Sequence, residues 1–306
     1  MNMTKSYGAQ QTAALLPYTE LVDTLSAAVV EYAAGSIESP ERLVVPLQAG
    51  GVMLSMPATA ADIAIHKLVN VCPGNKAQGK PTIHGQVTAY DSSSGELLFS
   101  LDGPTVTGRR TAGISALGIR CLARSAKSIL LIGTGKQASN HAEAFAALFP
   151  DAVLYVKGSS MQSAARFVAA HAGLGSPLTP IEGDMIPEDV DVVVTLTTSK
   201  TPVYREAARA GRLVVGVGAF TPDAAEIDAS IVHQSAIFVD DPAGARHEAG
   251  DLIQANVEWD TVGSLAAVIE GSWVGLPDQP LLFKSVGCAA WDLAAARLAR
   301  QRLSGV

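Results

Sequence analysis

The sequence predicts an α/β protein in which a parallel-sheet domain is inserted into a mixed α+β domain. Strands and helices alternate through the middle of the chain, which is typical of βαβ units and a parallel sheet. Short β-rich runs separated by turn residues come before this region and favour a mostly antiparallel sheet. A single helix follows it, and we expect that helix to pack on the N-terminal part. The predicted domains are 1–120 with 285–306, and 121–284.

The outer domain is expected to begin with a helix and to continue with strands. Residues 18–33 carry apolar side chains at helical spacing. Turn clusters such as CPGNKAQGKP and DSSSGE separate the β-rich runs that follow. These runs cover residues 42–47, 51–56, 62–71, 83–90 and 97–101. The last element of the domain is a helix over 288–302 that is rich in Ala and Arg.

The inserted domain is predicted from its alternation. A helix over 105–123 leads into the strand 128–132, whose continuous apolar run is typical of a strand buried on both faces. The remaining elements are expected as a helix at 139–148, a strand at 152–156, a helix at 161–171, strands at 191–196 and 213–216, a short helix near Glu226, and a strand at 236–240.

Composition and charge exclude several classes of protein. The 306 residues are 48% hydrophobic and 17% charged, which excludes a disordered chain and allows two buried cores. A formal charge of −7 argues against binding to nucleic acid or to an anionic membrane surface. No apolar run approaches the roughly 18 residues of a transmembrane helix, and the first twenty residues lack a signal-peptide core. Three widely spaced cysteines (Cys72, Cys121 and Cys288) fit neither a disulfide framework nor a zinc site. We therefore expect a reduced, cytoplasmic protein without a metal.

A glycine-rich turn follows the strongest predicted strand. Gly133, Gly135 and Ala138 form a GxGxxA motif that opens a helix, with Thr134 and Gln137 inside the same segment. The first glycine permits the tight turn, and the second lets backbone N–H groups approach a pyrophosphate at the positive end of the helix. Because strand, turn, helix and second strand all occur in order, a Rossmann-type dinucleotide site is favoured over a ligand-free turn.

The end of the second strand distinguishes between the two nicotinamide cofactors. An enzyme that uses NAD usually carries Asp or Glu there, which accepts a hydrogen bond from the ribose 2′-hydroxyl. This chain instead has Lys157, Ser159 and Ser160, which suit a 2′-phosphate. The alternative is that Lys157 is a solvated loop residue. We therefore expect NADPH as the cofactor, with NADH as the alternative.

Several further motifs resemble those of the ornithine cyclodeaminase/μ-crystallin family, and they span nearly the whole chain in the family's order. They are KLVNVCPGN (67–75), GKPT (79–82), LDG (101–103), TGRRTA (107–112), VT with TTS (194–199), Asp240 followed by EAGDL (248–252), and FKSVG (283–287). The resemblance implies a homodimer. It also implies a Rossmann domain set within a substrate-binding and dimerisation domain that is built from the N- and C-terminal segments.

The same resemblance implies a site for an amino or imino acid. In the family, the residues that match Arg42, Lys67 and Arg110 face the nicotinamide and hold the substrate carboxylate, which Arg can bind in a bidentate manner. Each of the three could instead be an ordinary surface residue, as charged residues mostly are. The family includes ornithine cyclodeaminases, reductases of cyclic ketimine carboxylates, some alanine dehydrogenases and μ-crystallins.

Other polar residues are weaker candidates. Thr82 could bind the substrate or the nicotinamide carboxamide, or it could be an ordinary strand residue. His84 would share a strand face with Thr82 and could donate a proton, although a lone His is more often structural. Thr197 and Thr198 follow a parallel strand at its carboxyl end, where open α/β sheets place ligands. The FKSVG motif adds Val286 to the expected cofactor contacts.

Phe220 distinguishes between the family's reactions. Ornithine cyclodeaminases resemble this chain but carry Asp where it has Phe220, and that acid is thought to handle the substrate amine. Asp223 could replace it only if the loop shifted. These residues favour reduction of Δ1-pyrroline-2-carboxylate to L-proline and of Δ1-piperideine-2-carboxylate to L-pipecolate. Arg42 and Arg110 would anchor the carboxylate, and Lys67 would exchange a proton with the imine nitrogen. The alternatives are a cyclodeaminase or alanine dehydrogenase, or a non-enzymatic binder of NADPH and a small ligand.

Overall fold

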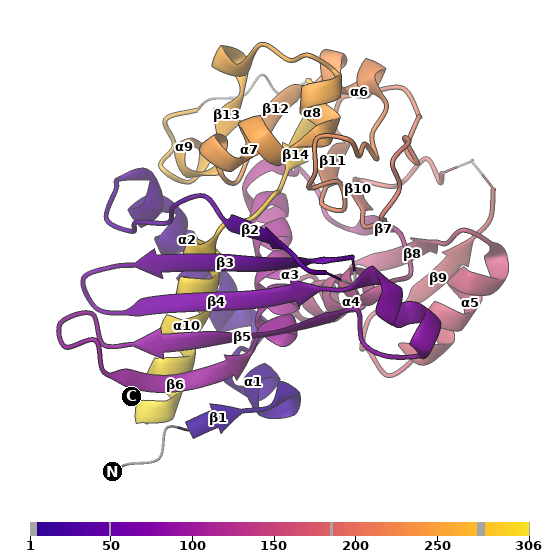
Figure 1. Cartoon of the computed structure of the whole chain (residues 1–306). Helices are drawn as coiled ribbons and strands as arrows, with labels where there is room; N and C mark the ends of the chain where they lie inside the picture. Colours follow the sequence, from indigo (N-terminus) through magenta and orange to yellow (C-terminus); the bar gives the residue numbers. More distant parts are fainter. Residues whose placement is uncertain (1–4, 49, 184–185, 274–278, 306) are drawn as a thin grey trace. The chain divides into compact units, whose positions relative to one another are not determined.

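The computed structural model describes residues 5–48, 50–183, 186–273 and 279–305. The chain divides into two compact units, one formed by Met1–Thr111 with Cys288–Val306 and the other by Ala112–Gly287. Each unit has its own sheet, and Figure 1 shows both with the elements labelled.

The boundaries between the units differ slightly from the predicted ones, which follow residues 120 and 284. Residues 112–120 and 285–287 belong to the inserted unit. The first boundary moves because α3 (Gly103–Leu122) is one continuous helix whose C-terminal part packs inside the second unit. There Gly118 lies so close to Phe283 that a Cβ atom would meet its ring at 2.5 Å.

The first unit is built on a six-stranded sheet in the order β1-β6-β5-β4-β3-β2. All neighbouring strands are antiparallel except β1 and β6, which are parallel. The strands are β1 (Lys5–Tyr7), β2 (Leu43–Pro46), β3 (Val52–Thr59), β4 (Ala64–Val71), β5 (Ile83–Tyr90) and β6 (Leu97–Asp102). The five predicted β-rich runs are therefore confirmed, whereas β1 is too short to show an alternating pattern.

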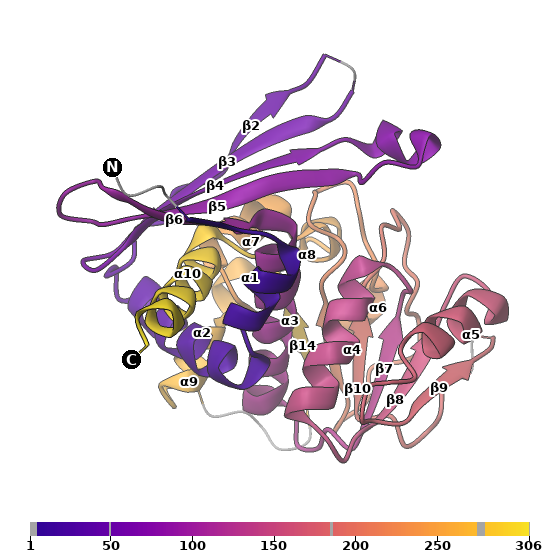
Figure 2. The same cartoon turned by 90° about the horizontal axis from the view of Figure 1, so that it is seen from below.

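Three helices cover one face of this sheet, as Figure 2 shows: α1 (Ala9–Leu15), α2 (Tyr18–Ala33) and α10 (Ala289–Ser304). The predicted N- and C-terminal helices correspond to α2 and α10, and α10 packs on α2 and on β3, β4 and β5. Most of α10 is buried, and its many alanines let its backbone approach the strands closely. The Trp291 ring packs edge-on against Tyr32, with the ring centres 5.7 Å apart.

The second unit is an eight-stranded parallel sheet in the order β13-β12-β14-β11-β10-β7-β8-β9. Its strands are β7 (Ser128–Ile132), β8 (Val153–Lys157), β9 (Leu178–Ile181), β10 (Val192–Thr195), β11 (Leu213–Gly216), β12 (Ala236–Val239), β13 (Gly263–Ser264) and β14 (Leu281–Lys284). Its helices besides α3 are α4 (Lys136–Leu148), α5 (Met161–Ala170), α6 (Ala229–Gln234), α7 (Pro242–Glu248), α8 (Gly250–Gln254) and α9 (Leu265–Ile269). Every residue of β7, β10 and β11 is buried, as the continuous apolar runs predict.

The short helix predicted near Glu226 is α6, which begins at Ala229 after the Asp228 cap, three residues beyond Glu226. Residues 224–228 themselves are not helical, and Ile227 forms a bridge with Tyr204. The backbone N–H groups of Glu226 and Ile227 donate to Asp251 at 2.6 and 2.9 Å instead of to a helical turn. This buried acceptor keeps the segment extended.

Within the described part of the chain, no single helix has both the length and the apolar character of a membrane span. By length and composition alone, α1 and α2 pass that test when counted together, with a bend of 70° between them. The described residues also contain no group of three or more His, Cys, Asp or Glu side chains arranged to hold a metal.

Candidate functional site

A buried acidic side chain joins two of the predicted cations in the first unit. Asp292, which is fully buried in the first turn of α10, accepts hydrogen bonds from Nζ of Lys67 at 3.1 Å to both carboxylate oxygens. Its Oδ1 also lies 3.4 Å from Nε of Arg110, which comes from α3. Lys67 and Arg110 are themselves almost completely buried. Two residues that the sequence places among the substrate contacts are therefore brought together by an acid that it did not single out.

Arg42 lies near the same place. It immediately precedes β2, whose first residue, Leu43, pairs with Ser55, the neighbour of Met56, and Met56 pairs with Lys67. Arg42 also acts on the pKa of Lys67, as expected for a nearby cation. We call Arg42, Lys67 and Arg110 the cation cluster.

The electrostatic environment of Lys67 reflects these neighbours. Burial lowers the pKa of Lys67 to about 8, and Arg110 and Arg42 act in the same direction, whereas Asp292 raises it. An ordinary Lys has a pKa near 10.5. A lysine whose pKa lies this close to neutrality can exchange a proton under physiological conditions.

The start of α3 explains why Arg110 points inward and the adjacent arginine does not. Asp102 accepts from the backbone N–H of Thr105 at 2.9 Å and fixes the first turn. Gly103 packs against β5 so closely that a Cβ atom would lie 2.7 Å from the carbonyl carbon of Gly85. Arg110 is seven residues further on, two helical turns away on the same side. Arg109 instead lies over the Tyr18 ring at 3.8 Å.

The structure does not bring Thr82 to the cation cluster. Thr82 lies just before β5, and its carbonyl accepts from the N–H of Cys72 at 2.7 Å. Cys72 is five residues beyond Lys67 along the direction of β4, which corresponds to about 17 Å. The neighbouring His84 is exposed and bonds the carbonyl of Pro81 at 3.1 Å. Both residues belong to the far end of the strands.

The glycine turn has the geometry that a dinucleotide needs. Gly133 has a φ of +131°, and a Cβ atom there would meet the carbonyl of Leu196 at 2.6 Å, so only glycine fits. Gly135 caps α4, and a Cβ atom there would meet nothing within 4 Å, which leaves open space above the helix end. No side chain caps α4, so its first N–H groups remain available to a phosphate.

Two further residues of the motif support a dinucleotide site at this turn. Ala138 is fully buried, as the third position of the motif requires for helix–strand packing. Gln137 carries a buried Oε1 atom that has no hydrogen-bond partner among the described residues. A ligand hydroxyl or amide can supply the missing donor. Thr134 lies between the two glycines in the turn itself.

The three residues expected at the 2′-phosphate follow β8. Lys157 is the last residue of β8, and its carbonyl accepts from the N–H of Gly133 at 2.9 Å, which ties it to the glycine turn. Ser159 and Ser160 are exposed. Ser160 caps α5 by accepting from the N–H of Ser163 at 3.2 Å, so its hydroxyl proton can still be donated to a ligand.

A second buried acid, Glu226, organises the loops after β10 and β11. Its Oε1 accepts from the N–H and the hydroxyl of Thr197 at 2.6 and 2.7 Å. Its Oε2 accepts from the hydroxyl of Thr195 at 3.0 Å and from the N–H groups of Gly218 and Ala219 at 2.6 and 3.1 Å. The Thr197 hydroxyl is therefore held by Glu226, while its neighbour in sequence, Thr198, is exposed. Burial raises the pKa of Glu226, whereas Lys284 and the bonds from Thr197 lower it.

The loop after β14 is held in the same way. Asp240 accepts from the hydroxyl of Ser285 at 2.9 Å and from the N–H groups of Val286 and Gly287 at 2.9 and 3.0 Å. Buried Lys284 lies 2.7 Å from Asp251, the acid that holds the backbone of Glu226. Carboxylates thus fix three successive loops at the carboxyl edge of the parallel sheet, where ligands bind in such folds.

Phe220 and Asp223 lie in the loop after β11. Phe220 is 49% exposed. Asp223 is engaged by Nζ of Lys200 and, at 2.7 Å, by the hydroxyl of Thr221. These two bonds hold the pKa of Asp223 below its usual range, so it stays a carboxylate paired with its own loop.

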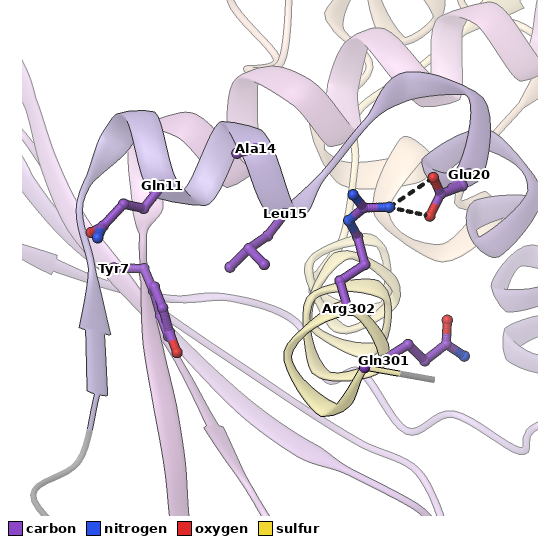
Figure 3. Close-up of a pocket in the computed structure, with 8 residues that line it drawn as sticks. Tyr7, Gln11, Ala14, Leu15, Glu20, Gln301 and Arg302 are labelled. Atoms are coloured by element: carbon purple, nitrogen blue, oxygen red, sulfur yellow. Dashed lines mark hydrogen bonds and ion pairs between the residues drawn. The ribbon is translucent and has the colours of Figure 1, made fainter.

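A pocket of about 490 Å³ in the first unit contains none of the predicted site residues. It is lined by Tyr7, Gln11, Ala14, Leu15, Glu20, Gln301, Arg302 and Gly305. Figure 3 shows Arg302 turned toward Glu20, with which it forms a solvent-exposed ion pair at 2.8 Å. The cation cluster and the glycine turn both lie outside this pocket.

The two acids that sequence reasoning missed leave only weak signals in the sequence. Asp292 follows Trp291 inside a helix that reads as Ala- and Arg-rich, and its position in the first turn is the one hint of a helix-end role. Glu226 stands in the apolar run AAEI, where an isolated acid suggests a buried partner.

Comparison with known proteins agrees with the resemblance seen in the sequence motifs. Residues 5–306 match the ornithine cyclodeaminase/mu-crystallin family. The Delta(1)-pyrroline-2-carboxylate/Delta(1)-piperideine-2-carboxylate reductase of Azospirillum brasilense is 68% identical over 299 residues, covering 97% of this chain and 96% of that protein. Delta(1)-pyrroline-2-carboxylate reductase 1 of Burkholderia multivorans is 65% identical over 304 residues, covering 99% and 97%.

A solved structure is similar over the whole chain. The Delta(1)-pyrroline-2-carboxylate reductase of Thermococcus litoralis, in complex with NADH and L-proline, has a TM-score of 0.88 and 25% identity, covering 99% of each chain. An archaeal alanine dehydrogenase dimer with bound NAD has a TM-score of 0.87 and 25% identity, covering 99% of this chain and 97% of that one. The fold, the site geometry and these matches together show that the chain belongs to the ornithine cyclodeaminase/μ-crystallin family.

Proposed function

We propose that this protein is an oxidoreductase that reduces the C=N bond of cyclic ketimine carboxylates. Its substrates are Δ1-pyrroline-2-carboxylate, which gives L-proline, and Δ1-piperideine-2-carboxylate, which gives L-pipecolate. The observation that carries the proposal is the cation cluster, in which Lys67 and Arg110 share the single buried carboxylate of Asp292 and Arg42 acts on Lys67. Reductases that are named for these reactions and that are 65–68% identical to the chain support the same assignment.

The charge balance of the cation cluster favours a monocarboxylate ligand. Lys67 and Arg110 share the single carboxylate of Asp292, which leaves an excess of positive charge in a buried place that is costly until an anion enters. Arg110 contacts Asp292 through Nε, and the two terminal nitrogens of a guanidinium have the geometry to bind a carboxylate in a bidentate manner. Arg42, which acts on the pKa of Lys67, supplies a second guanidinium. A compact imino acid offers one carboxylate for these groups.

Lys67 supplies the proton chemistry in this proposal. A bound reduced nicotinamide provides the hydride that the imine carbon accepts. The carboxylate held by Arg42 and Arg110 fixes the orientation of the ring, and Lys67 beside it exchanges a proton with the ring nitrogen. The pKa of Lys67, lowered by burial to about 8, suits this exchange near neutral pH.

We further propose that NADPH is the preferred form of the cofactor. Lys157 at the end of β8 offers a cation, and Ser159 and Ser160 offer hydroxyl donors, where NAD enzymes place an acid. Gly133, Gly135 and the free N–H groups of α4 fit the pyrophosphate. The T. litoralis relative was solved with NADH, so the preference depends on these residues of the present chain alone.

We also propose that the protein acts as a homodimer in the cytoplasm. Leu43, Val44 and Val45 of the edge strand β2 are 62%, 51% and 42% exposed, and Ile83 is 44% exposed. An unpaired apolar edge of this kind is normally covered by a partner. The archaeal alanine dehydrogenase of the same fold is a dimer. Cys72, Cys121 and Cys288 form no disulfide, which fits a reducing compartment.

A steady-state assay tests the reaction. Oxidation of NADPH is measured with five- and six-membered cyclic imino acids and with pyruvate plus ammonia, and ammonia release is measured with L-ornithine. We expect turnover with the cyclic imino acids and none with ornithine, because Phe220 cannot take a proton and Asp223 is paired with Lys200. Ammonia release from ornithine would refute the choice of reaction, and NADPH binding without any turnover would indicate a binding protein.

A further inference from the structure

The proposed reaction leaves the role of Asp292 unexplained, because its carboxylate does not belong to the groups that hold the substrate. It is fully buried, and both its oxygens are 3.1 Å from Nζ of Lys67. An acid at the centre of an anion-binding site repels the substrate carboxylate. Such a residue therefore needs a physical reason for its position.

The surroundings of Lys67 supply that reason. Its neighbours in the sheet register, Met56 and Val87, are buried and uncharged. The charged groups that act on its pKa are Arg110, Arg42 and Asp292. Burial and both arginines favour a neutral amine, and Asp292 alone opposes them. Without Asp292, a charged Lys67 would face two like charges in a desolvated place.

The fold also holds Asp292 ionised at a fixed position. It lies in the first turn of α10, where the helix dipole stabilises a negative charge. The same helix is anchored further along by Arg297 and Arg300, which bind the carboxylate of Asp62 at 2.7 and 2.6 Å. The position of Asp292 against β4 therefore does not depend on its own ion pair alone.

We propose that Asp292 is a positioning residue that keeps the Lys67 side chain charged and aimed beside the two arginines, so that Lys67 is the proton donor to the substrate nitrogen. This inference rests on the proposed reduction of a cyclic imine. When the hydride adds to the imine carbon, the electron pair of the C=N bond moves to nitrogen. That nitrogen takes a proton from Nζ of Lys67, and the neutral Lys67 side chain is then protonated again from water. Asp292 remains a carboxylate throughout.

The test is the pH profile of kcat for imine reduction in the native enzyme and in Asp292→Asn, which is nearly the same size but uncharged. We expect kcat of the native enzyme to fall above about pH 8, the pKa of Lys67. Removing an opposite charge at this distance should move the alkaline limb of the profile about 1–3 units toward acid. At pH values below the shifted limb, kcat of the variant should recover most of the native value. A role in folding alone would lower activity equally at every pH.

A second variant covers the case in which Asp292→Asn does not fold. Asp292→Glu keeps the charge but displaces Nζ of Lys67. It should therefore lower kcat and leave the alkaline limb within about half a unit of the native position. A limb that moves by a unit or more in Asp292→Glu would overturn the inference.

Asp62→Asn is the matched control, because it removes a carboxylate that binds α10 through Arg297 and Arg300 and leaves the carboxylate beside Lys67 in place. It should lower the thermal stability and leave the limb in place. An unmoved limb in Asp292→Asn, in an enzyme that reduces cyclic imines, contradicts the role of Asp292 while the proposed function stands. Lack of imine reduction by the native enzyme contradicts the proposed function itself.

Discussion

Replacing Glu226 with Gln should weaken both the second unit and its affinity for the cofactor. The Glu226 carboxylate is fully buried, and both of its oxygens act as hydrogen-bond acceptors. The donors are the N–H and hydroxyl of Thr197 on one oxygen, and the hydroxyl of Thr195 with the N–H groups of Gly218 and Ala219 on the other. Gln has the same shape but presents one oxygen and one NH₂ group. One of the two sets of donors must therefore face another donor.

The loss of stability in Glu226→Gln depends on which of the two sets of hydrogen-bond donors loses its acceptor. If the amide nitrogen faces Thr197, the threonine hydroxyl can turn to accept from it, and only the Thr197 N–H is left unsatisfied. If it faces the other side, the N–H groups of Gly218 and Ala219 both lose their acceptor. The first arrangement is therefore preferred. An unsatisfied buried group costs about 1–3 kcal/mol, and a bond to a charged acceptor contributes about 1.5–3 kcal/mol. We expect the free energy of unfolding of Glu226→Gln to fall by about 2–4 kcal/mol.

Urea unfolding followed by circular dichroism measures this change, with Glu182→Gln as the control because Glu182 is exposed in the same unit. Fluorescence titration with NADPH measures the second effect. The loop that carries Thr197 follows β10 at the carboxyl edge, so Kd for NADPH should rise about tenfold or more. An unfolding midpoint and slope equal to those of the native protein would refute the view that this carboxylate fixes the loops.

Three further predictions concern single side chains. Burial lowers the pKa of His141 to about 4 from its ordinary 6.5, so the unfolded chain binds more protons between these values. The contribution of His141 to stability should be full above pH 6.5 and fall by about 3 kcal/mol as the pH drops to 4, and His141→Gln should remove this part of the pH dependence in urea titrations. The native enzyme should have a higher kcat/KM with NADPH than with NADH, and Lys157→Asp should have a kcat/KM about tenfold or more higher with NADH. A preference of the native enzyme for NADH would exclude the assigned role of Lys157. Arg42→Ala or Arg110→Ala should each weaken binding of the imino acid by about 2–5 kcal/mol. The value of kcat/KM for the imino acid should fall about thirtyfold or more, with little change in Kd for NADPH. Near-native kinetics in both variants would contradict the proposed site.

The sequence predicts those parts of the fold that are determined by local patterns. β7 is a continuous apolar run of five residues, and β4 and β5 are long enough to show alternation, so their existence follows from side-chain periodicity. β13 has only two residues, and β14 lies between β11 and β12 although it is distant from both in the sequence. Pairing of this kind is decided by the sheet as a whole, which no window of sequence contains.

In the candidate site, too, some residues could be predicted from local sequence motifs and others could not. Lys67 and Arg110 could be named because they stand in motifs that resemble those of a family. Their shared partner, Asp292, is 225 residues from Lys67 and 182 from Arg110, so only the folded chain brings the three together. Glu226 itself was not singled out by any motif, and its carboxylate binds the loops that follow two separate strands, β10 and β11. In both cases an acid serves groups far away in sequence.

The buried acids of the two units differ in the groups that surround them. This difference separates acids that fix the structure from the acid in the proposed site. Glu226 and Asp240 accept from backbone N–H groups and hydroxyls, so each fixes a loop. Asp251 pairs with Lys284, which also acts on Glu226. Asp292 faces a cluster in which cations outnumber it. Of these four acids, only Asp292 therefore lies where burial favours the entry of an anion, and that is where the carboxylate of an imino acid has the strongest physical reason to bind.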